Sequence, residues 1–369
     1  MKKFIRKVLL LCLSLTVSLL LAEFIVSVVK PQDLSGSWGV QSARALVVNK
    51  SEGVARHQFG ARVVYYSFAA PHLRAPAPRA SVKVLVLGDS FTFGYLLGDG
   101  DTYVSLLQSR LDEEFGPGVF SLLNGAVAGW GAGDYVAFVD DFGEEVAPDI
   151  VLVFVSPDDI GRALRSPQWS LSPADGQLVR AVVPRSRLKV LLNGLPGYQW
   201  LLEHSHLVQL LRNQAELLAK KPSRRAAAQT PLGPGSEPDG ENARRGRVLG
   251  AALFRRLSSW CNERDVKLLV ASTGWHQPLG TNPAEPTEAF MSGAEPFFSG
   301  LGVPFSDPWD TLHRRMGGEP RRFMIQGDGH PNEAGAALIA EGAFPFIESQ
   351  FGEYCRRTAR CQARDGVRP

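Results

Sequence analysis

A continuous apolar run from residue 82 to residue 87, Val-Lys-Val-Leu-Val-Leu, constrains the fold most strongly. Such a run is too apolar for a strand with one face in water and is typical of a central strand in a parallel sheet. Four more strands are expected at 119–123, 150–155, 266–271 and 303–305, and helical patterns occupy 103–115, 134–142, 246–263 and 332–348. Strands that alternate with helices predict βαβ units, and therefore a parallel sheet with helices on both faces.

The N-terminus has the pattern of a membrane segment. An apolar stretch runs from Val8 to Ala22, resumes after Glu23 and ends at Lys30-Pro31. The four basic residues that precede it are Lys2, Lys3, Arg6 and Lys7. Read through Glu23, the stretch spans about 22 residues, or roughly 33 Å as a helix, which matches the hydrocarbon core of a bilayer. Read only to Ala22, it resembles the apolar region of a signal peptide. The missing A-x-A cleavage site and the return of apolar residues favour an uncleaved anchor with the rest of the chain outside. Glu23 is expected at the outer interface, or else against a partner helix.

The remaining chain divides by composition. Residues 31–80 mix Gly, Pro and Arg with short apolar pieces and are interpreted as a stalk or entry segment, residues 81–350 as the main domain, and residues 351–369 as a tail. An insertion at 166–245 interrupts the βαβ pattern. It is expected to contain a hairpin around Asp175-Gly176, a helix at 199–218 and a disordered piece at 220–245 that lacks large apolar residues.

Charge and cysteine content narrow the functional classes. The formal net charge is +3 and the basic residues form no single stripe, so a nucleic-acid partner is not expected. None of the four cysteines forms a C-x-x-C pair, so no structural zinc site is expected. In an oxidising compartment, Cys355 and Cys361 are close enough in sequence to form a disulfide, whereas Cys261 has the surroundings of a buried helix residue.

Two segments carry the residue types of nucleophilic catalysis. Gly88-Asp89-Ser90 directly follows the first strand, and ligands of open parallel sheets bind at the carboxyl ends of strands. Asp328-Gly329-His330 places a carboxylate two residues before a histidine, just ahead of the last helix. The carboxylate can hold the Nδ1 proton of the imidazole while Nε2 faces the serine hydroxyl. In isolation, each segment also fits a structural role, a capped turn or a helix start.

Two further loops lie at the same edge of the sheet. Residues 124–131, Asn-Gly-Ala-Val-Ala-Gly-Trp-Gly, form a small-residue loop in which backbone N–H groups can approach a bound group. Residues 156–160, Ser-Pro-Asp-Asp-Ile, follow the third strand. Adjacent Asp side chains in a loop rarely point at one ion, so no metal site is expected.

Together these segments resemble the SGNH (GDSL-type) hydrolase superfamily, over residues 82–348 without the insertion. The resemblance implies a three-layer α/β/α sandwich with a flavodoxin-like, five-stranded parallel sheet, here after an N-terminal transmembrane helix. It also implies that Ser90 is the nucleophile, that His330 is the base and Asp328 its partner, and that the N–H groups of Ser90 and Gly129 form an oxyanion hole. The D-x-H form of the last block is similar to that of some bacterial, membrane-anchored or polysaccharide-modifying branches.

One position departs from the family pattern. The family's third block supplies an asparagine amide to the oxyanion hole, and the matching residue here is Asp158. An ionised carboxylate cannot donate a hydrogen bond and opposes a nearby oxyanion. The site then depends on the Ser90 and Gly129 amides, on a protonated Asp158, or on Asn124 in its place.

The sequence thus predicts a cofactor-independent serine esterase or deacylase outside the cytoplasmic membrane. By the resemblance and the location, its substrate is an acylated small molecule or carbohydrate, with carbohydrate O-acetyl groups preferred. O-acyl transfer to a glycan shares the first half-reaction and remains an alternative. A weak or inactive glycan-binding or assembly protein with the same fold is a second alternative, because of Asp158.

Overall fold

A computed structural model describes residues 1–44, 46–166, 168–181, 191–227, 239–275 and 286–361. The chain forms two compact units. The first comprises Met1–Ser37, Ala55–Tyr65 and Ser186–Ser236, and the second comprises Trp38–Val54, Tyr66–Arg185 and Glu237–Pro369.

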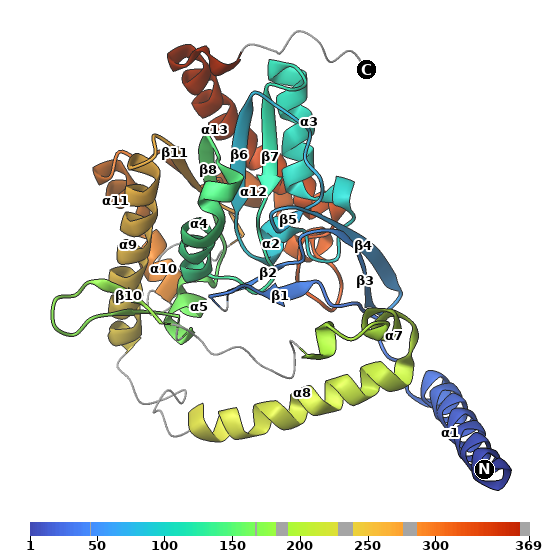
Figure 1. The fold of residues 1–369 in the computed structure, drawn as a ribbon. Coiled ribbons are helices and arrows are strands. Elements are labelled where there is room, and N and C mark those ends of the chain that lie inside the picture. The colour runs from blue at the N-terminus through green and yellow to red at the C-terminus, as the bar shows by residue number, and fades with distance from the viewer. Residues whose placement is uncertain (45, 167, 182–190, 228–238, 276–285, 362–369) are drawn as a thin grey trace. The chain divides into compact units, whose positions relative to one another are not determined.

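The second unit is built on a five-stranded sheet in the order β12-β11-β8-β6-β7 (Figure 1). Its strands are β6 (Val82–Leu87), β7 (Phe120–Asn124), β8 (Ile150–Val155), β11 (Lys267–Ser272) and β12 (Phe305–Ser306). All four neighbouring pairs are parallel. Numbered along the chain this order is 2-1-3-4-5, so the flavodoxin-like sheet is confirmed and its strands lie within one or two residues of the expected ranges.

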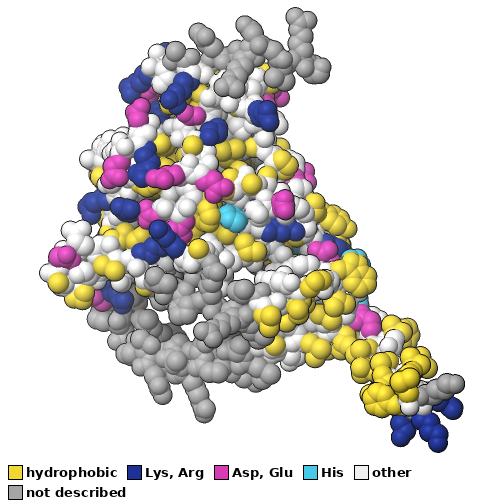
Figure 2. Space-filling model, viewed as in Figure 1, with side chains coloured by type: hydrophobic (Ala, Val, Ile, Leu, Met, Phe, Trp, Pro, Cys, Tyr) yellow, Lys and Arg dark blue, Asp and Glu magenta, His cyan; other side chains and the backbone are white. Residues whose placement is uncertain are grey.

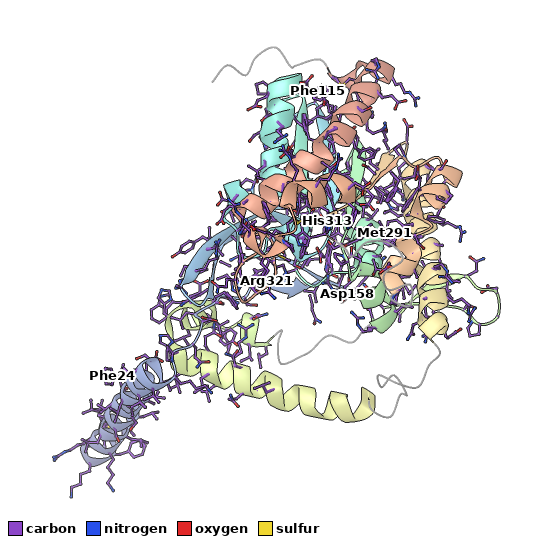
Figure 3. The ribbon with its side chains drawn as sticks, turned by 180° about the vertical axis from the view of Figure 1, so that it is seen from behind. Phe24, Phe115, Asp158, Met291, His313 and Arg321 are labelled. Carbon is purple, nitrogen blue, oxygen red and sulfur yellow. A yellow bond between two sulfur atoms is a disulfide. The ribbon has the colours of Figure 1, made fainter. Side chains whose placement is uncertain are left out.

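Helices cover both faces of this sheet. Strand residues alternate between two cores: Val84, Val86 and Leu152 pack into one, and Leu85, Leu87 and Val153 into the other. Helices α3 (Tyr103–Phe115), α12 (Trp309–Met316) and α13 (Glu333–Arg357) share the first core, and α4 (Ala132–Val146), α9 (Asp239–Asn262) and α11 (Ala294–Gly300) share the second (Figures 1 and 3). The three-layer sandwich is therefore confirmed.

The shorter helices of this unit are α2 (Ser90–Phe93), α5 (Asp159–Arg165), α10 (Pro286–Met291) and the 3-10 turns η1 (Asp99–Asp101), η2 (Pro320–Phe323) and η3 (Ala359–Cys361).

The expectation of an irregular stalk at residues 31–80 is wrong. The segment forms an antiparallel pair, β1 (Gly39–Gln41) with β2 (Val47–Asn49), and a three-stranded sheet of β3 (Gly53–Phe59), β4 (Arg62–Ala69) and β5 (Leu73–Arg74). Alternate residues of β4 are buried, among them Val64, Tyr66 and Phe68. This period of two is the mark of a half-buried strand, but the apolar residues Val63 and Tyr65 on the exposed face hide it in the sequence.

The insertion is more helical than expected. The predicted hairpin is confirmed as β9 (Trp169–Leu171) paired with β10 (Leu178–Arg180). The single expected helix is two, α7 (Tyr198–His204) and α8 (His206–Ala227), separated at Ser205. Helices α8 and α9 extend into the stretch expected to be disordered, because its Ala, Arg and Lys residues are good helix formers. Only residues 228–238 of that stretch lie outside the described residues.

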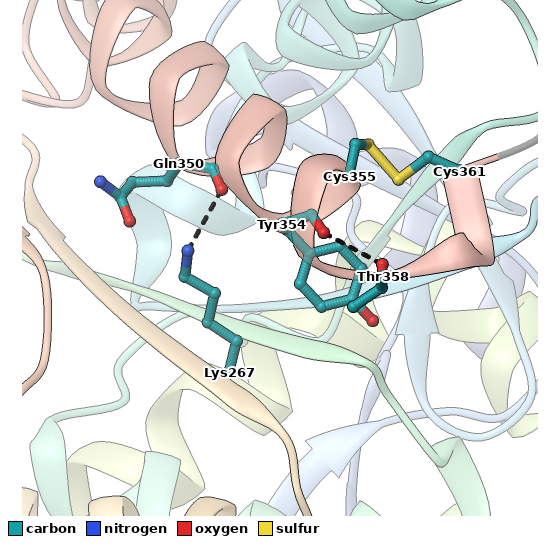
Figure 4. Close-up of a disulfide and its surroundings, with 6 residues drawn as sticks. All are labelled: Lys267, Gln350, Tyr354, Cys355, Thr358 and Cys361. Atoms are coloured by element: carbon teal, nitrogen blue, oxygen red, sulfur yellow. Dashed lines mark hydrogen bonds between the residues drawn. A yellow bond between two sulfur atoms is a disulfide. The ribbon is translucent and has the colours of Figure 1, made fainter.

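At the C-terminus, α13 continues past the expected domain end at residue 350 to Arg357. The Cys355–Cys361 disulfide is confirmed and joins the last turn of α13 to η3 (Figure 4). Close to it, the Lys267 ammonium of β11 donates a hydrogen bond to the Gln350 carbonyl at 3.2 Å. Cys261 is fully buried in α9, as expected, and burial raises the pKa of its thiol to about 12.

The first unit begins with one long helix, α1 (Lys2–Val29), which is long and apolar enough to cross a membrane or to be a signal sequence. Its surface is almost entirely hydrophobic apart from the basic residues at its N-terminal end (Figure 2). Glu23, expected at the outer interface, contacts the start of α8. Its carboxylate accepts hydrogen bonds from the Ser205 hydroxyl at 2.6 Å, His206 N–H at 2.7 Å and Leu207 N–H at 3.0 Å, and so caps α8.

Candidate active site

The serine segment is a tight turn between β6 and the one-turn helix α2. Gly88 is required there because a Cβ would collide with the side chain of Thr92. Asp89 caps α2, since its Oδ1 accepts a hydrogen bond from Phe91 N–H at 2.9 Å. Ser90 is the first residue of α2 and is only 5% exposed. The hydroxyl is thus held at the carboxyl end of β6, beside β8, where the strand order of the sheet reverses.

The histidine segment is equally constrained. Gly329 has a φ of +95°, which favours glycine and lets the chain turn between Asp328 and His330. The His330 carbonyl accepts a hydrogen bond from Ile325 N–H at 2.8 Å, and the Asn332 side chain caps α13 through Gly335 N–H at 3.0 Å. These bonds fix the loop on both sides of the imidazole.

The structure brings Ser90, Asp328 and His330 together. His330 Nε2 lies 2.8 Å from Ser90 Oγ, and His330 Nδ1 is bonded to Asp328 Oδ1. Asp328 Oδ1 also accepts a hydrogen bond from the His330 N–H at 3.2 Å. A serine, an imidazole and a carboxylate joined in this order form the arrangement in which a hydroxyl can pass its proton to a histidine.

The Gly129 loop is also tied to the serine segment. Val127 N–H donates to the Gly88 carbonyl at 3.4 Å, two residues before both Gly129 and Ser90. Gly129 has a φ of +90°, and an added Cβ would meet no atom within 4 Å, so backbone conformation rather than crowding selects glycine. Asn124 has a different role from the one considered for it: its amide nitrogen donates to the Thr92 carbonyl at 2.9 Å, and its oxygen accepts from Ala126 N–H at 3.1 Å.

The two acidic residues after β8 have separate surroundings. Asp158 immediately precedes α5 (Figure 3). Its side chain is 42% exposed and pairs with Arg165 at 2.5 Å and Arg162 at 3.4 Å. Asp159 is fully buried and accepts hydrogen bonds from the Tyr135 hydroxyl at 2.6 Å and Ser156 N–H at 2.7 Å. Burial raises the pKa of Asp159 well above its ordinary value, and the neighbouring Asp89 carboxylate raises it further. Within the described residues, no group of three His, Cys, Asp or Glu side chains is arranged to hold a metal ion.

Sequence reasoning missed Arg162. Its Nη1 donates to Asp89 Oδ2 at 2.8 Å and to the Trp130 carbonyl at 2.7 Å, so it joins the loops after β6, β7 and β8. The only local signal was its position four residues after Asp158. No periodicity or motif relates it to Asp89, which lies 73 residues earlier.

Aromatic rings surround the imidazole. The Tyr95 and Phe91 rings lie 4.7 Å and 5.5 Å from the His330 ring, and Trp275 meets Phe91 edge to face at 6.4 Å. All three aromatic residues are partly exposed. Trp275 therefore reaches the site through its contact with Phe91.

One family model matches more than half of the chain. The model of the GDSL-like lipase/acylhydrolase family matches residues 86–338, which include Ser90, Gly129, Asp158, Asp328 and His330. No curated protein matches the chain significantly.

Several solved structures are similar to the chain. One is the psychrotrophic esterase EstA from Pseudoalteromonas sp., at 14% identity over 73% of this chain and 98% of that one, with a TM-score of 0.42. Another is a catalytic mutant of the acetylxylan esterase Axe2 from Geobacillus stearothermophilus, at 13% identity over 73% and 95%, with a TM-score of 0.40. A two-domain esterase active on acetylated mannans matches at 14% identity over 73% of this chain and 49% of that one, with a TM-score of 0.40. At these scores, none of the three bears on the substrate of this chain.

Proposed function

The chain belongs to the GDSL-like lipase/acylhydrolase family of ester-hydrolysing serine hydrolases, and from this premise we propose that Ser90 is its nucleophile, His330 its base and Asp328 the acid that orients His330. The observation that carries the proposal is the 2.8 Å contact between Ser90 Oγ and His330 Nε2. In the first half-reaction Oγ attacks the ester carbonyl carbon, and the hydroxyl proton passes to Nε2. The protonated imidazole then gives that proton to the leaving alcohol as the acyl-enzyme forms. In the second half-reaction water attacks the acyl carbonyl carbon and gives a proton to Nε2. The imidazole then returns that proton to Ser90 Oγ as the bond between the acyl group and the serine breaks, which releases the acid and restores Ser90.

Asp328 keeps the imidazole in the required tautomer. A hydrogen bond from Nδ1–H to its carboxylate leaves Nε2 unprotonated and directed at Ser90. We propose that the N–H groups of Ser90 and Gly129 donate hydrogen bonds to the carbonyl oxygen of the ester as its negative charge develops. Asp158, at the third position of this oxyanion hole, has its carboxylate paired with Arg165 and Arg162, which reduces its repulsion of that charge.

Covalent labelling of the full-length chain in detergent micelles tests the nucleophile. The wild type should react with a serine-directed fluorophosphonate and hydrolyse short-chain aryl acetates, and Ser90→Ala should do neither. Ser121→Ala is the matched control, because Ser121 is equally buried but lies on β7. Labelling that persists in Ser90→Ala, or a wild type that neither labels nor turns over, would refute the assignment.

For the substrate, we propose an O-acetylated carbohydrate. Partly exposed aromatic rings beside a catalytic centre bind the apolar faces of sugar rings, and Tyr95, Phe91 and Trp275 occupy that place here. Tyr95→Ala should raise KM for an acetylated oligosaccharide about tenfold, the equivalent of roughly 1.4 kcal/mol. Its KM for an aryl acetate should change far less, and Tyr65→Ala, an exposed tyrosine of β4, should change neither. Equal effects on both esters, or faster turnover of long-chain acyl esters, would refute a carbohydrate site.

For the location, we propose that α1 is retained as an anchor and that the remaining chain lies outside the cytoplasmic membrane. Basic residues at the N-terminal end of α1 favour a cytoplasmic position for that end. The Cys355–Cys361 disulfide fits an oxidising compartment. Protease added to spheroplasts should digest the chain from its C-terminus to the membrane, whereas protection until the membrane is lysed would refute this orientation.

A further inference from the structure

The residue before the proposed nucleophile is a buried carboxylate. The Asp89 side chain is 1% exposed. Its Oδ1 accepts hydrogen bonds from Phe91 N–H at 2.9 Å and from the Ser156 hydroxyl at 2.7 Å. Its Oδ2 lies 3.4 Å from Ser90 Oγ and 2.8 Å from Arg162 Nη1. The same carboxylate oxygen of Asp89 therefore contacts both the nucleophile and a guanidinium.

An unpaired carboxylate at this place would impair catalysis in two ways. It is a second acceptor for the Ser90 hydroxyl, at 3.4 Å against 2.8 Å for His330 Nε2, and so competes with the base for the proton. It also places a negative charge close to the carbonyl oxygen that becomes anionic. In a buried site such a charge acts more strongly than in water.

Arg162 is the cation that faces Asp89. The Trp130 carbonyl, at 2.7 Å, fixes the guanidinium together with Asp89, and the Arg162 side chain remains 28% exposed. Asp158 and Arg165 complete a group with two carboxylates and two guanidiniums, and therefore no net charge. Asp159 also borders this group, with its Oδ1 3.7 Å from Arg162 Nη1, and burial and the nearby Asp89 carboxylate raise its pKa.

We propose that Arg162 is a positioning residue for the nucleophile. Its guanidinium neutralises Asp89 and draws Oδ2 toward itself, so that the Ser90 hydroxyl is left to His330 and the oxyanion forms beside a neutral pair. The proposal rests on the proposed function of Ser90 but goes beyond it, because it assigns a role to a residue outside the three catalytic positions and outside the oxyanion hole.

Kinetics of full-length Arg162→Gln, with short-chain aryl acetates, test the proposal. We expect kcat and the rate of fluorophosphonate labelling to fall roughly a hundredfold, as for other lost electrostatic groups near an oxyanion, with KM changed less than about threefold. Arg162→Lys keeps the charge and should recover part of the loss. Arg256→Gln is the matched control: it breaks an ion pair of similar length, 2.9 Å to Asp140, away from Ser90.

A second substitution separates the electrostatic role from a structural one. In Arg162→Gln/Asp89→Asn the buried carboxylate is removed with its partner, and the Gln oxygen can accept from the Asn amide. We expect kcat within about tenfold of the wild type, well above that of Arg162→Gln. A double variant as slow as folded Arg162→Gln overturns the proposal, as does Arg162→Gln with wild-type kcat.

If Arg162→Gln does not fold, the test becomes a comparison of kcat between Asp89→Asn and the double variant. Equal kcat in the two supports the proposal, because Arg162 then matters only while Asp89 is charged. A double variant at least tenfold slower than Asp89→Asn overturns it. A wild type without labelling or turnover refutes the proposed function itself, and that result is distinct from either outcome.

Discussion

Ser90 Oγ and His330 Nε2 lie 2.8 Å apart although 240 residues separate them in the chain. The contact exists because the turn after β6 and the loop before α13 end at the same edge of the parallel sheet. Each partner is fixed independently, Ser90 by the Asp89 cap of α2 and His330 by Ile325 and Asp328. Changes to individual members of this arrangement therefore have separable consequences.

Asp328→Asn should lower kcat by about a thousandfold to ten-thousandfold and leave KM within a few-fold. An amide can donate to Nδ1 as well as accept from it, so the imidazole loses its defined tautomer and its stabilising charge. Steady-state kinetics and the fluorophosphonate labelling rate measure the effect. The control is Asp175→Asn at the exposed tip of the β9–β10 hairpin. If Asp328→Asn loses less than about tenfold, the orienting acid lies elsewhere.

Asp158→Asn should raise kcat on aryl acetates about tenfold or more. By the proposed oxyanion hole, an asparagine at this position supplies an amide donor and removes a carboxylate from the side of the oxyanion. Thermal unfolding should accompany the kinetics, because the substitution also weakens the pairs with Arg165 and Arg162. A folded variant with unchanged kcat would mean that Asp158 does not face the oxyanion.

Asp134→Asn should stabilise the protein more at pH 7 than at pH 4. Burial raises the pKa of Asp134 to about 6, against an ordinary value of 3.8. A raised folded-state pKa contributes stability that is fully present below pH 3.8 and is lost as the pH rises to about 6. This difference corresponds to up to about 3 kcal/mol. The asparagine oxygen can still accept the hydrogen bond from Gly131 N–H at 2.9 Å.

The readout is the difference in Tm between Asp134→Asn and the wild type. It should grow by several degrees between pH 4 and pH 6.5 and then stay constant. A Tm difference that does not change with pH would show that folding does not raise the pKa of Asp134.

Glu23→Ala should loosen α8 without releasing the chain from membranes. The substitution removes three hydrogen bonds to Ser205, His206 and Leu207, and losing a helix cap costs about 1 kcal/mol. Proteolysis within α8 should therefore accelerate about fivefold. Thr16→Ala is the control, because the Thr16 hydroxyl bonds only to Cys12 O within α1. Unchanged proteolysis would show that α8 does not depend on α1, and release from the membrane would contradict an anchoring role for α1 alone.

The sequence by itself determined the parallel sheet and most helices around it, because their signals are local. The apolar run at Val82–Leu87 and the 3.6-residue periodicity of helices such as Tyr103–Phe115 depend only on neighbouring residues. The pairing of Ser90 with His330 was anticipated from the residue types of the two segments and from their resemblance to blocks of one family. Residues 31–80 were misread because the exposed face of β4 also carries apolar residues, Val63 and Tyr65, which hide its period of two in the sequence.

Only the tertiary structure decided which charges meet. Arg162 and Asp89 are 73 residues apart, and Glu23 and Ser205 are 182 apart, yet each pair forms a hydrogen-bonded contact. No periodic pattern encodes such pairs, because they depend on which loops the sheet order brings to one edge and which helix ends lie side by side. The sequence marked Asp158 as a departure from the family pattern, and the structure supplied the arginines that pair with it.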